Sequence, residues 1–168
     1  MVFVICLIFT GCNTTELEER CFPLMVSIGY EDGTVVYGVA FSQEDEVGKS
    51  TVKNAVGKLF SESKTAYENR LNRDADYNHL KVLVLEEDFL EHQTVYEEML
   101  QYLAQTEDFP RNTYVCVVDD VEDLFELEQT LSLDLGTYFE EYLKKQEEKK
   151  NKLLTLGDLI DEKENHAM

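Results

Sequence analysis

Two hydrophobic runs near the start of the chain have the pattern of a β-hairpin. They span Cys21 to Tyr30 and Thr34 to Phe41, both rich in Val, Ile, Phe and Tyr, and they flank a Glu-Asp-Gly sequence at 31–33. Asp-Gly between two β-branched runs is among the strongest hairpin signals in a sequence. Pro23 lies near the start of the first run, where a missing backbone donor matters least. We therefore predict two antiparallel strands joined by a tight turn.

Two further apolar runs predict strands later in the chain, at His79 to Leu85 and Thr113 to Val118. Continuous apolar runs of this kind suit strands that helices cover on both faces. Thr51 to Leu59 fits either a short strand or a short helix. The polar stretch from Ser42 to Ser50 predicts a loop that follows the hairpin.

Three Thr-x-x-Glu sequences predict helix starts, because hydroxyl and carboxylate can satisfy each other's free backbone donors. They are Thr65 to Glu68, Thr94 to Glu97 and Thr137 to Glu140. We expect the first helix to run towards Arg73. The second ends before the Phe-Pro-Arg sequence at 109–111 and carries apolar residues at helical spacing: Val95, Met99, Leu100 and Leu103.

The third predicted helix has an apolar stripe formed by Tyr138, Phe139, Tyr142 and Leu143. Two i,i+4 pairs of favourable polarity, Glu140 with Lys144 and Glu141 with Lys145, support it. The polar stretch 146–152 extends this helix or serves as a connector, and 153–160 is apolar again.

The order of these elements predicts an α/β (α+β) fold. We expect a mixed sheet of four or five strands with an N-terminal hairpin, flanked by three to four helices. A single domain fills 21–160, and we expect a disordered, frayed tail at 161–168. The order in which the strands pair stays open at this point.

The first twelve residues form an apolar run that closes with Thr10, Gly11 and Cys12. An apolar core of about 7–15 residues before small residues is typical of a secretory signal. With a cysteine at the first mature position, the segment resembles a bacterial lipoprotein signal, in which Cys12 carries the lipid. The alternative is a buried N-terminal strand or helix, although about 18 apolar residues are needed to span a bilayer. We predict a signal at 1–11 and a short tether at 12–20.

The charge of the chain argues against several classes of partner. It carries 35 acidic and 15 basic residues, for a formal charge of −20. Such a chain repels a phosphate backbone and lacks the counterion release that drives nucleic-acid binding. It is equally unsuited to anionic lipid headgroups, so membrane attachment should come from the lipid itself. Nine Tyr, nine Phe and 43% apolar residues still predict a folded core.

The cysteines and histidines give no sign of a metal site. With Cys6 in the signal and Cys12 acylated, Cys21 and Cys116 remain; they are either small core residues or the one possible disulfide. No CxxC and no Cys/His pair at zinc spacing occurs. The three histidines, at 79, 92 and 166, are far apart in the sequence, and we expect His79 to cap or pack.

Acidic clusters follow two of the predicted strands. The first, Glu86, Glu87 and Asp88, fits a general acid and base pair or, more simply, acids at a helix entrance. Asp119 and Asp120 fit a helix N-cap better than a calcium loop, which needs alternating ligands and a glycine. We see no catalytic constellation, and we expect a protein that is not an enzyme and needs no cofactor or metal.

Four segments together resemble the Ger(x)C spore germination lipoproteins, the C subunits of nutrient germinant receptors. The first is Gly11 and Cys12 with the acids at 16–19 and the strand end at 27–31. The others are 77–87 (Tyr-Asn-His-Leu before an apolar strand closed by Glu-Glu), 108–118 (Phe-Pro-Arg-Asn-Thr before a strand) and 153–159. Their order and spacing agree with the family over nearly the whole chain.

The resemblance implies a non-catalytic subunit with Cys12 as its lipid-bearing residue. Proteins of this family are held by lipid on the outer face of the inner spore membrane, beside two integral-membrane receptor subunits. The chain covers what resembles the first domain of such a subunit. His79 is a motif position with no assigned role.

Two other functions remain open. One is an extracytoplasmic small-ligand-binding domain whose acidic loops face a cationic solute, such as a polyamine or an amino acid. The other is a lipid-anchored hydrolase that uses Glu86, Glu87 or Asp119.

Overall fold

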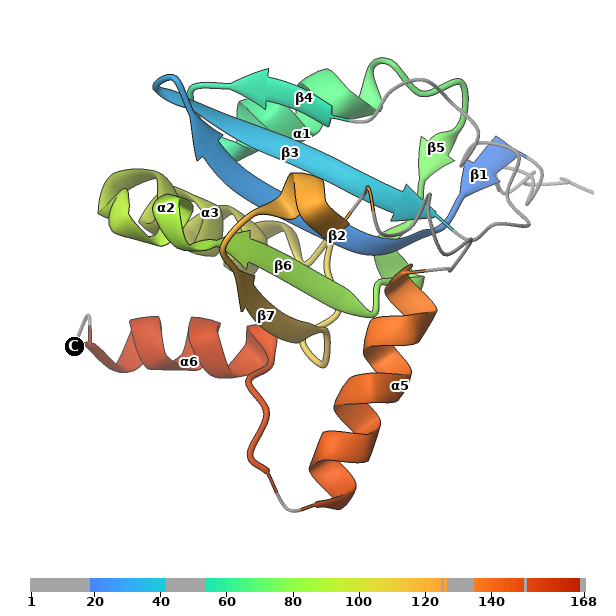
Figure 1. Ribbon diagram of the computed structural model, residues 1–168. Helices are drawn as coiled ribbons and strands as arrows, with labels where there is room; N and C mark the ends of the chain where they lie inside the picture. Colours follow the sequence, from blue (N-terminus) through green and yellow to red (C-terminus); the bar gives the residue numbers. More distant parts are fainter. Residues whose placement is uncertain (1–18, 42–53, 125, 127–134, 150, 167–168) are drawn as a thin grey trace, which may run out of the picture.

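A five-stranded mixed sheet forms the centre of the molecule, as the computed structural model shows (Figure 1). The model describes residues 19–41, 54–124, 126, 135–149 and 151–166. The sheet has the order β4-β3-β2-β6-β7, and β1 and β5 form a separate two-stranded sheet. The strands are β1 (Arg20–Cys21), β2 (Pro23–Glu31), β3 (Thr34–Phe41), β4 (Asn54–Gly57), β5 (Asp74–Ala75), β6 (Val82–Glu86) and β7 (Tyr114–Val118).

Helices pack against this sheet, which confirms the predicted α+β class. They are α1 (Phe60–Glu68), α2 (Glu87–Glu91), α3 (Gln93–Thr106), α5 (Leu135–Glu148) and α6 (Leu156–His166), with a 3-10 turn at Tyr77–His79. A further helical segment covers 121–124. Among the described residues, no helix is both long and apolar enough to cross a membrane.

The hairpin of β2 and β3 is confirmed. Asp32 and Gly33 both have positive φ, 50° and 81°, as a two-residue turn between right-twisted strands requires. On the other side of β2, strands β6 and β7 run parallel to it, and β4 is antiparallel to β3. Of the two alternatives for 51–59, the strand is therefore found. The predicted loop at 42–50 lies outside the described residues.

Successive side chains of each strand enter different cores, because strand residues alternate between the two faces of a sheet. Val26 and Ile28 pack with α1, α3 and α6, whereas Met25 packs with Leu135 and Leu143 of α5. The first core is the larger of the two and includes the predicted apolar stripe of α3. The sheet is thus the middle layer, and α5 covers part of its second face.

The predicted start of the first helix is wrong. Helix α1 begins at Phe60, five residues before Thr65, and ends at Glu68. Its first amides are capped from α3: the Glu98 carboxylate accepts from the Phe60 amide at 2.9 Å and from the Ser61 hydroxyl at 2.6 Å. A cap supplied by another helix leaves no local sequence signal.

The other two Thr-x-x-Glu sequences also lie inside their helices. Helix α3 begins at Gln93, with no side-chain cap from His92, and α5 is described from Leu135 onwards. In α5, Glu140 pairs instead with Lys144 at 2.6 Å, the i,i+4 pair that we predicted, and with Lys81 at 3.4 Å.

The expected frayed tail from Asp161 is wrong, because α6 continues to His166. A reciprocal cap opens this helix: the Asp158 carboxylate accepts from the Thr155 amide at 2.9 Å, and the Thr155 hydroxyl accepts from the Asp158 amide at 3.3 Å. Contacts to other helices hold the last turns. The Lys163 ammonium, for example, donates to the carbonyl of Glu97 in α3 at 2.6 Å.

Two of the predicted strands differ from the structure in their extent: one is shorter than its apolar run, and the other is split in two. The run from His79 starts on the last residue of the 3-10 turn, and β6 begins only at Val82. The run from Cys21 is divided at Phe22, because Cys21 pairs with Ala75 of β5 and leaves the main sheet. The strand predicted at 113–118 is confirmed as β7.

Candidate functional site

The carboxyl ends of the three parallel strands meet at one edge of the sheet, which is a common place for ligand sites in α/β folds. A cavity of about 280 Å³ lies there. Its wall carries six carboxylate residues: Glu31, Glu86, Asp88, Asp119, Asp120 and Glu122. No lysine, arginine or histidine is among the described residues that line it. We call this cavity the acidic crevice.

The sequence-predicted acids therefore come together although they are distant in the chain. Glu86 closes β6, Asp88 lies in the first turn of α2, and Asp119 follows β7. Glu87 lies in the same first turn but is not among the residues that line the crevice. The structure thus unites Glu86, Asp88 and Asp119 and leaves Glu87 outside.

Glu86 is held in place at the base of the crevice. One carboxylate oxygen accepts from the Val121 amide at 2.9 Å. The other lies over Gly29 of β2, so closely that a Cβ built on Gly29 would be 2.0 Å from it. A side chain at this position would have to displace the Glu86 carboxylate, which glycine leaves in place.

Replacing Gly29 by alanine should therefore lower the free energy of unfolding by about 1–3 kcal/mol, since an added methyl forces Glu86 off the Val121 amide. Denaturant unfolding measures the loss. In a Glu86→Ala background the same change should cost less than about 0.5 kcal/mol, because the clash is gone. Equal losses in both backgrounds would contradict the contact.

Several of the crevice acids also have a structural role. The Asp120 carboxylate accepts from the Glu122 amide at 2.7 Å and caps the helical segment at 121–124. This confirms the predicted N-cap. Glu87 and Asp88 lie in the first turn of α2, as expected of acids at a helix entrance. Among the described residues, no group of three or more His, Cys, Asp or Glu side chains is arranged to hold a metal ion.

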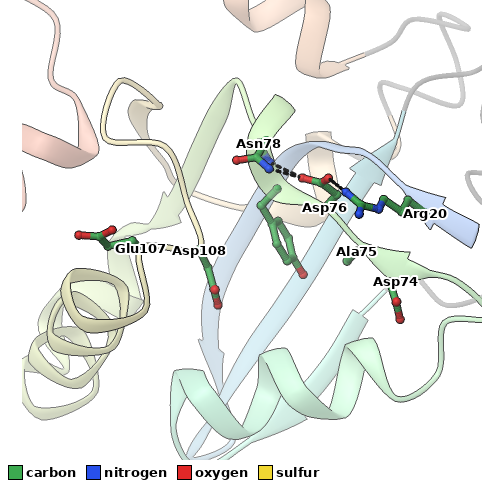
Figure 2. Close-up of a pocket in the computed structure, with 8 residues that line it drawn as sticks. Arg20, Asp74, Ala75, Asp76, Asn78, Glu107 and Asp108 are labelled. Atoms are coloured by element: carbon green, nitrogen blue, oxygen red, sulfur yellow. Dashed lines mark hydrogen bonds and ion pairs between the residues drawn. The ribbon is translucent and has the colours of Figure 1, made fainter. Parts of the chain in front are cut away.

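A second hollow, of about 340 Å³, lies where the N-terminal segment enters the fold (Figure 2). The Arg20 guanidinium pairs with Asp76 at 3.0 Å, and the other Asp76 oxygen accepts from the Asn78 backbone and side-chain amides at 3.1 and 2.7 Å. Burial acts to raise the pKa of Asp76, but these donors outweigh it and hold the pKa below its usual range. This cluster fastens β1 beside β5.

A buried lysine lies next to that hollow. Lys64 of α1 is 4% exposed, and its ammonium pairs with Glu68 at 2.8 Å and with Asp108 at 2.9 Å. It also lies 4.9 Å from the ring centre of Tyr77 and 5.7 Å from that of Tyr102. Sequence reasoning missed this cluster, because a lysine in an amphipathic helix gives no sign that it is buried.

The histidines and cysteines whose side chains the structure describes have packing roles. The His79 ring meets Phe22 edge-on at 5.1 Å, and His92 lies against Tyr30 at 3.7 Å between ring centres. Of the two roles expected of His79, capping and packing, the ring contact shows packing. The side chain of His166 and the whole of Cys12 lie outside what the structure describes.

Cys21 and Cys116 are not joined by a disulfide. The Cys21 thiol is buried and donates to the carbonyl of Asp74 at 3.7 Å. Cys116 is half-buried, and burial raises the pKa of its thiol to about 11. Both are therefore core thiols, the first of the two alternatives.

Comparison with known proteins gives one match. The family model described as "Spore germination protein N-terminal domain" matches residues 13–167. No curated protein and no solved structure matches the chain. The matched range includes every residue that the structure describes and begins directly after Cys12.

Proposed function

Because the chain belongs to the spore germination protein N-terminal domain family, we propose that it is a lipid-tethered interaction domain of a nutrient germinant receptor. Cys12 carries the lipid in this proposal, and integral-membrane receptor subunits are the partners. The family match over 13–167 is the observation that carries it. The family gives the chain a role in spore germination, related to germinant receptors; the tether, its orientation and the partners are our proposal.

The start of the fold suits a tether. Arg20 and Cys21 form β1, which pairs in parallel with β5, and the Arg20 guanidinium is fixed by Asp76. The domain is thus fastened within eight residues of Cys12, so a lipid on Cys12 would hold it close to the membrane surface. A tether this short spans at most about 30 Å when fully extended.

The arrangement of the crevice acids supports a non-catalytic role. Glu86 and Asp120 are engaged as acceptors for backbone amides, and Asp88 lies in a helix first turn. A hydrolase needs a nucleophile or base within hydrogen-bond reach of a partner that activates it. Among the described crevice residues, no nucleophile or base has such an activating partner, which argues against the hydrolase alternative.

Two exposed tyrosines offer a contact surface for partners. Tyr138 and Tyr142 lie one turn apart on α5 and are 47% and 48% exposed. Exposed tyrosines combine apolar area with a polar tip and are enriched in protein interfaces. They support a role in assembly with the receptor subunits.

Replacing Cys12 by alanine tests the anchor. The variant should lose incorporation of labelled fatty acid and leave the membrane fraction under an alkaline wash, because a chain with a formal charge of −20 has no affinity of its own for anionic lipid. Cys6→Ala is the matched control, since it changes a cysteine of the same segment but leaves the proposed lipid site. A Cys12→Ala protein that keeps its label and its membrane fraction would overturn the anchor.

A further inference from the structure

The acidic crevice contains a hydroxyl group that makes no hydrogen bond within the described part of the fold. Ser27 of β2 lines the crevice and is 2% exposed, yet its hydroxyl makes no hydrogen bond to any described residue. In the described part of the chain, every fully enclosed polar side-chain atom has a partner. The Ser27 oxygen must therefore reach the open space of the crevice. A nearly buried hydroxyl without a partner costs free energy unless a ligand or water supplies one.

On this face Ser27 has a glycine beside it in β3 and Val84 beside it in β6, so the hollow opens on the β3 side. Ser27 is opposite Gly38 of β3, and Gly29 is the next residue of β2 on the same face. Further along this face, Met25 and Ala40 are covered by α5. The crevice is thus the part of the second sheet face where small side chains leave a hollow under the rim of carboxylates.

The charge of the crevice defines the class of ligand. Six carboxylate residues line it and no basic residue is among its described lining, a charge that favours a cation as ligand. A zwitterion such as an amino acid would bring a carboxylate that finds no partner there. A hard metal ion such as Mg²⁺ or Ca²⁺ needs several oxygen ligands at about 2.0–2.6 Å. Among the described residues, no group of three acids is arranged to hold such an ion.

The spacing of the carboxylates favours more than one positive group. They follow three neighbouring strands, β2, β6 and β7, and adjacent strands lie about 4.8 Å apart. Glu31 and Asp119 therefore lie at opposite sides of the crevice, with Glu86 between them. A chain of methylene groups with an ammonium at each end can reach both sides, whereas one ammonium cannot.

We propose that the acidic crevice binds a linear aliphatic polyamine. One ammonium donates to the Ser27 hydroxyl and the Glu86 carboxylate at the floor, and another pairs with the rim acids Asp88 and Asp119. The methylene segment lies along Val36 and Gly38 of β3. This site is independent of the tether at Cys12.

Isothermal titration calorimetry of the purified full chain with spermidine tests the proposal, with Mg²⁺ and alanine as competing probes. Spermidine should bind with one-site stoichiometry. Ser27→Ala should weaken it about ten-fold, the effect of one hydrogen bond to a charged group. The double change Asp88→Asn and Asp119→Asn should weaken it about three-fold to ten-fold, as expected for exposed ion pairs.

Glu148→Gln is the matched control, because it removes an exposed acid from the end of α5, away from the crevice. It should leave the affinity unchanged, and thermal melts should show that all variants are folded. Absence of binding would overturn the proposal. An equal loss of spermidine affinity in Glu148→Gln would also overturn it, because the attraction would then come from the overall negative charge. Tighter binding of Mg²⁺ or alanine than of spermidine would overturn it as well.

Discussion

Replacing Phe60 by alanine should lower the free energy of unfolding by about 3–5 kcal/mol, the usual cost of removing a large aromatic ring from a core. Phe60 is fully buried at the start of α1. Its ring packs against Tyr37 at 5.7 Å, Tyr102 at 5.5 Å and Phe109 at 6.3 Å between centres. It therefore joins the hairpin, α3 and the loop before β7.

Urea unfolding followed by circular dichroism measures this loss. Tyr138→Ala is the control, because that ring is 47% exposed and its removal should change stability by less than about 0.5 kcal/mol. A loss below about 1 kcal/mol for Phe60→Ala would mean that α1 is not docked as described. The slope of the free energy of unfolding against urea concentration should be the same in both variants if the domain unfolds as one unit.

Replacing Lys64 by methionine should cost about 2–3 kcal/mol, although methionine is apolar and of similar length. The change leaves the carboxylates of Glu68 and Asp108 without their cation. Breaking a fully buried pair typically costs about 3–5 kcal/mol, and these two carboxylates, about one third exposed, can regain some hydration. A variant as stable as the wild type would contradict the account of this cluster.

The contribution of the Lys64 cluster to stability depends on pH in a defined direction. Burial disfavours the charged form of Lys64, but the hydrogen bonds and charges of Glu68 and Asp108 outweigh it, so the pKa of Lys64 lies above its usual range. A pKa raised by folding stabilises the protein fully below the pKa of the unfolded chain, and that contribution is lost as pH rises through the folded pKa. As pH rises from neutral, the difference in stability between wild type and Lys64→Met should thus stay constant and then shrink in strong alkali. Lys144→Met, at an exposed i,i+4 pair with Glu140, should leave the melting temperature unchanged.

The hairpin could be predicted because its signals are local. The Asp-Gly turn and the β-branched runs of the hairpin depend on neighbouring residues alone, and the structure confirms them. The order β4-β3-β2-β6-β7 could not be predicted, because it depends on pairings between segments more than fifty residues apart, such as Met25 with Val82.

The helix starts show where local reasoning failed. The Thr-x-x-Glu sequences looked like caps, yet α1 is capped by Glu98 from another helix. The one reciprocal cap found among the described helices opens α6, with Asp158 in place of the expected glutamate three residues after Thr155. The charged residues after Ile160 predict a frayed tail from Asp161, whereas the helix that this box opens continues to His166.

The candidate site could be predicted in part. Acids after two strands were visible in the sequence, and the parallel arrangement of β6 and β7 brings Glu86 and Asp119 to one edge. Ser27 and Gly29 gave no signal, because small residues inside a strand have meaning only when the opposite side chains are known. The Glu86 carboxylate over Gly29 is a long-range contact of this kind.

Our proposal that a lipid holds this domain beside integral-membrane partners makes a prediction about the complex in spore membranes. A tagged chain is extracted from spore membranes in mild detergent and purified by size-exclusion chromatography, and its N-terminal peptide and co-eluting proteins are analysed by mass spectrometry. We predict a lipid-modified Cys12 and co-elution with a polytopic membrane protein that a cross-linker placed at Tyr138 also captures. An unmodified Cys12, or a lipid-bearing chain that elutes alone, would contradict the account.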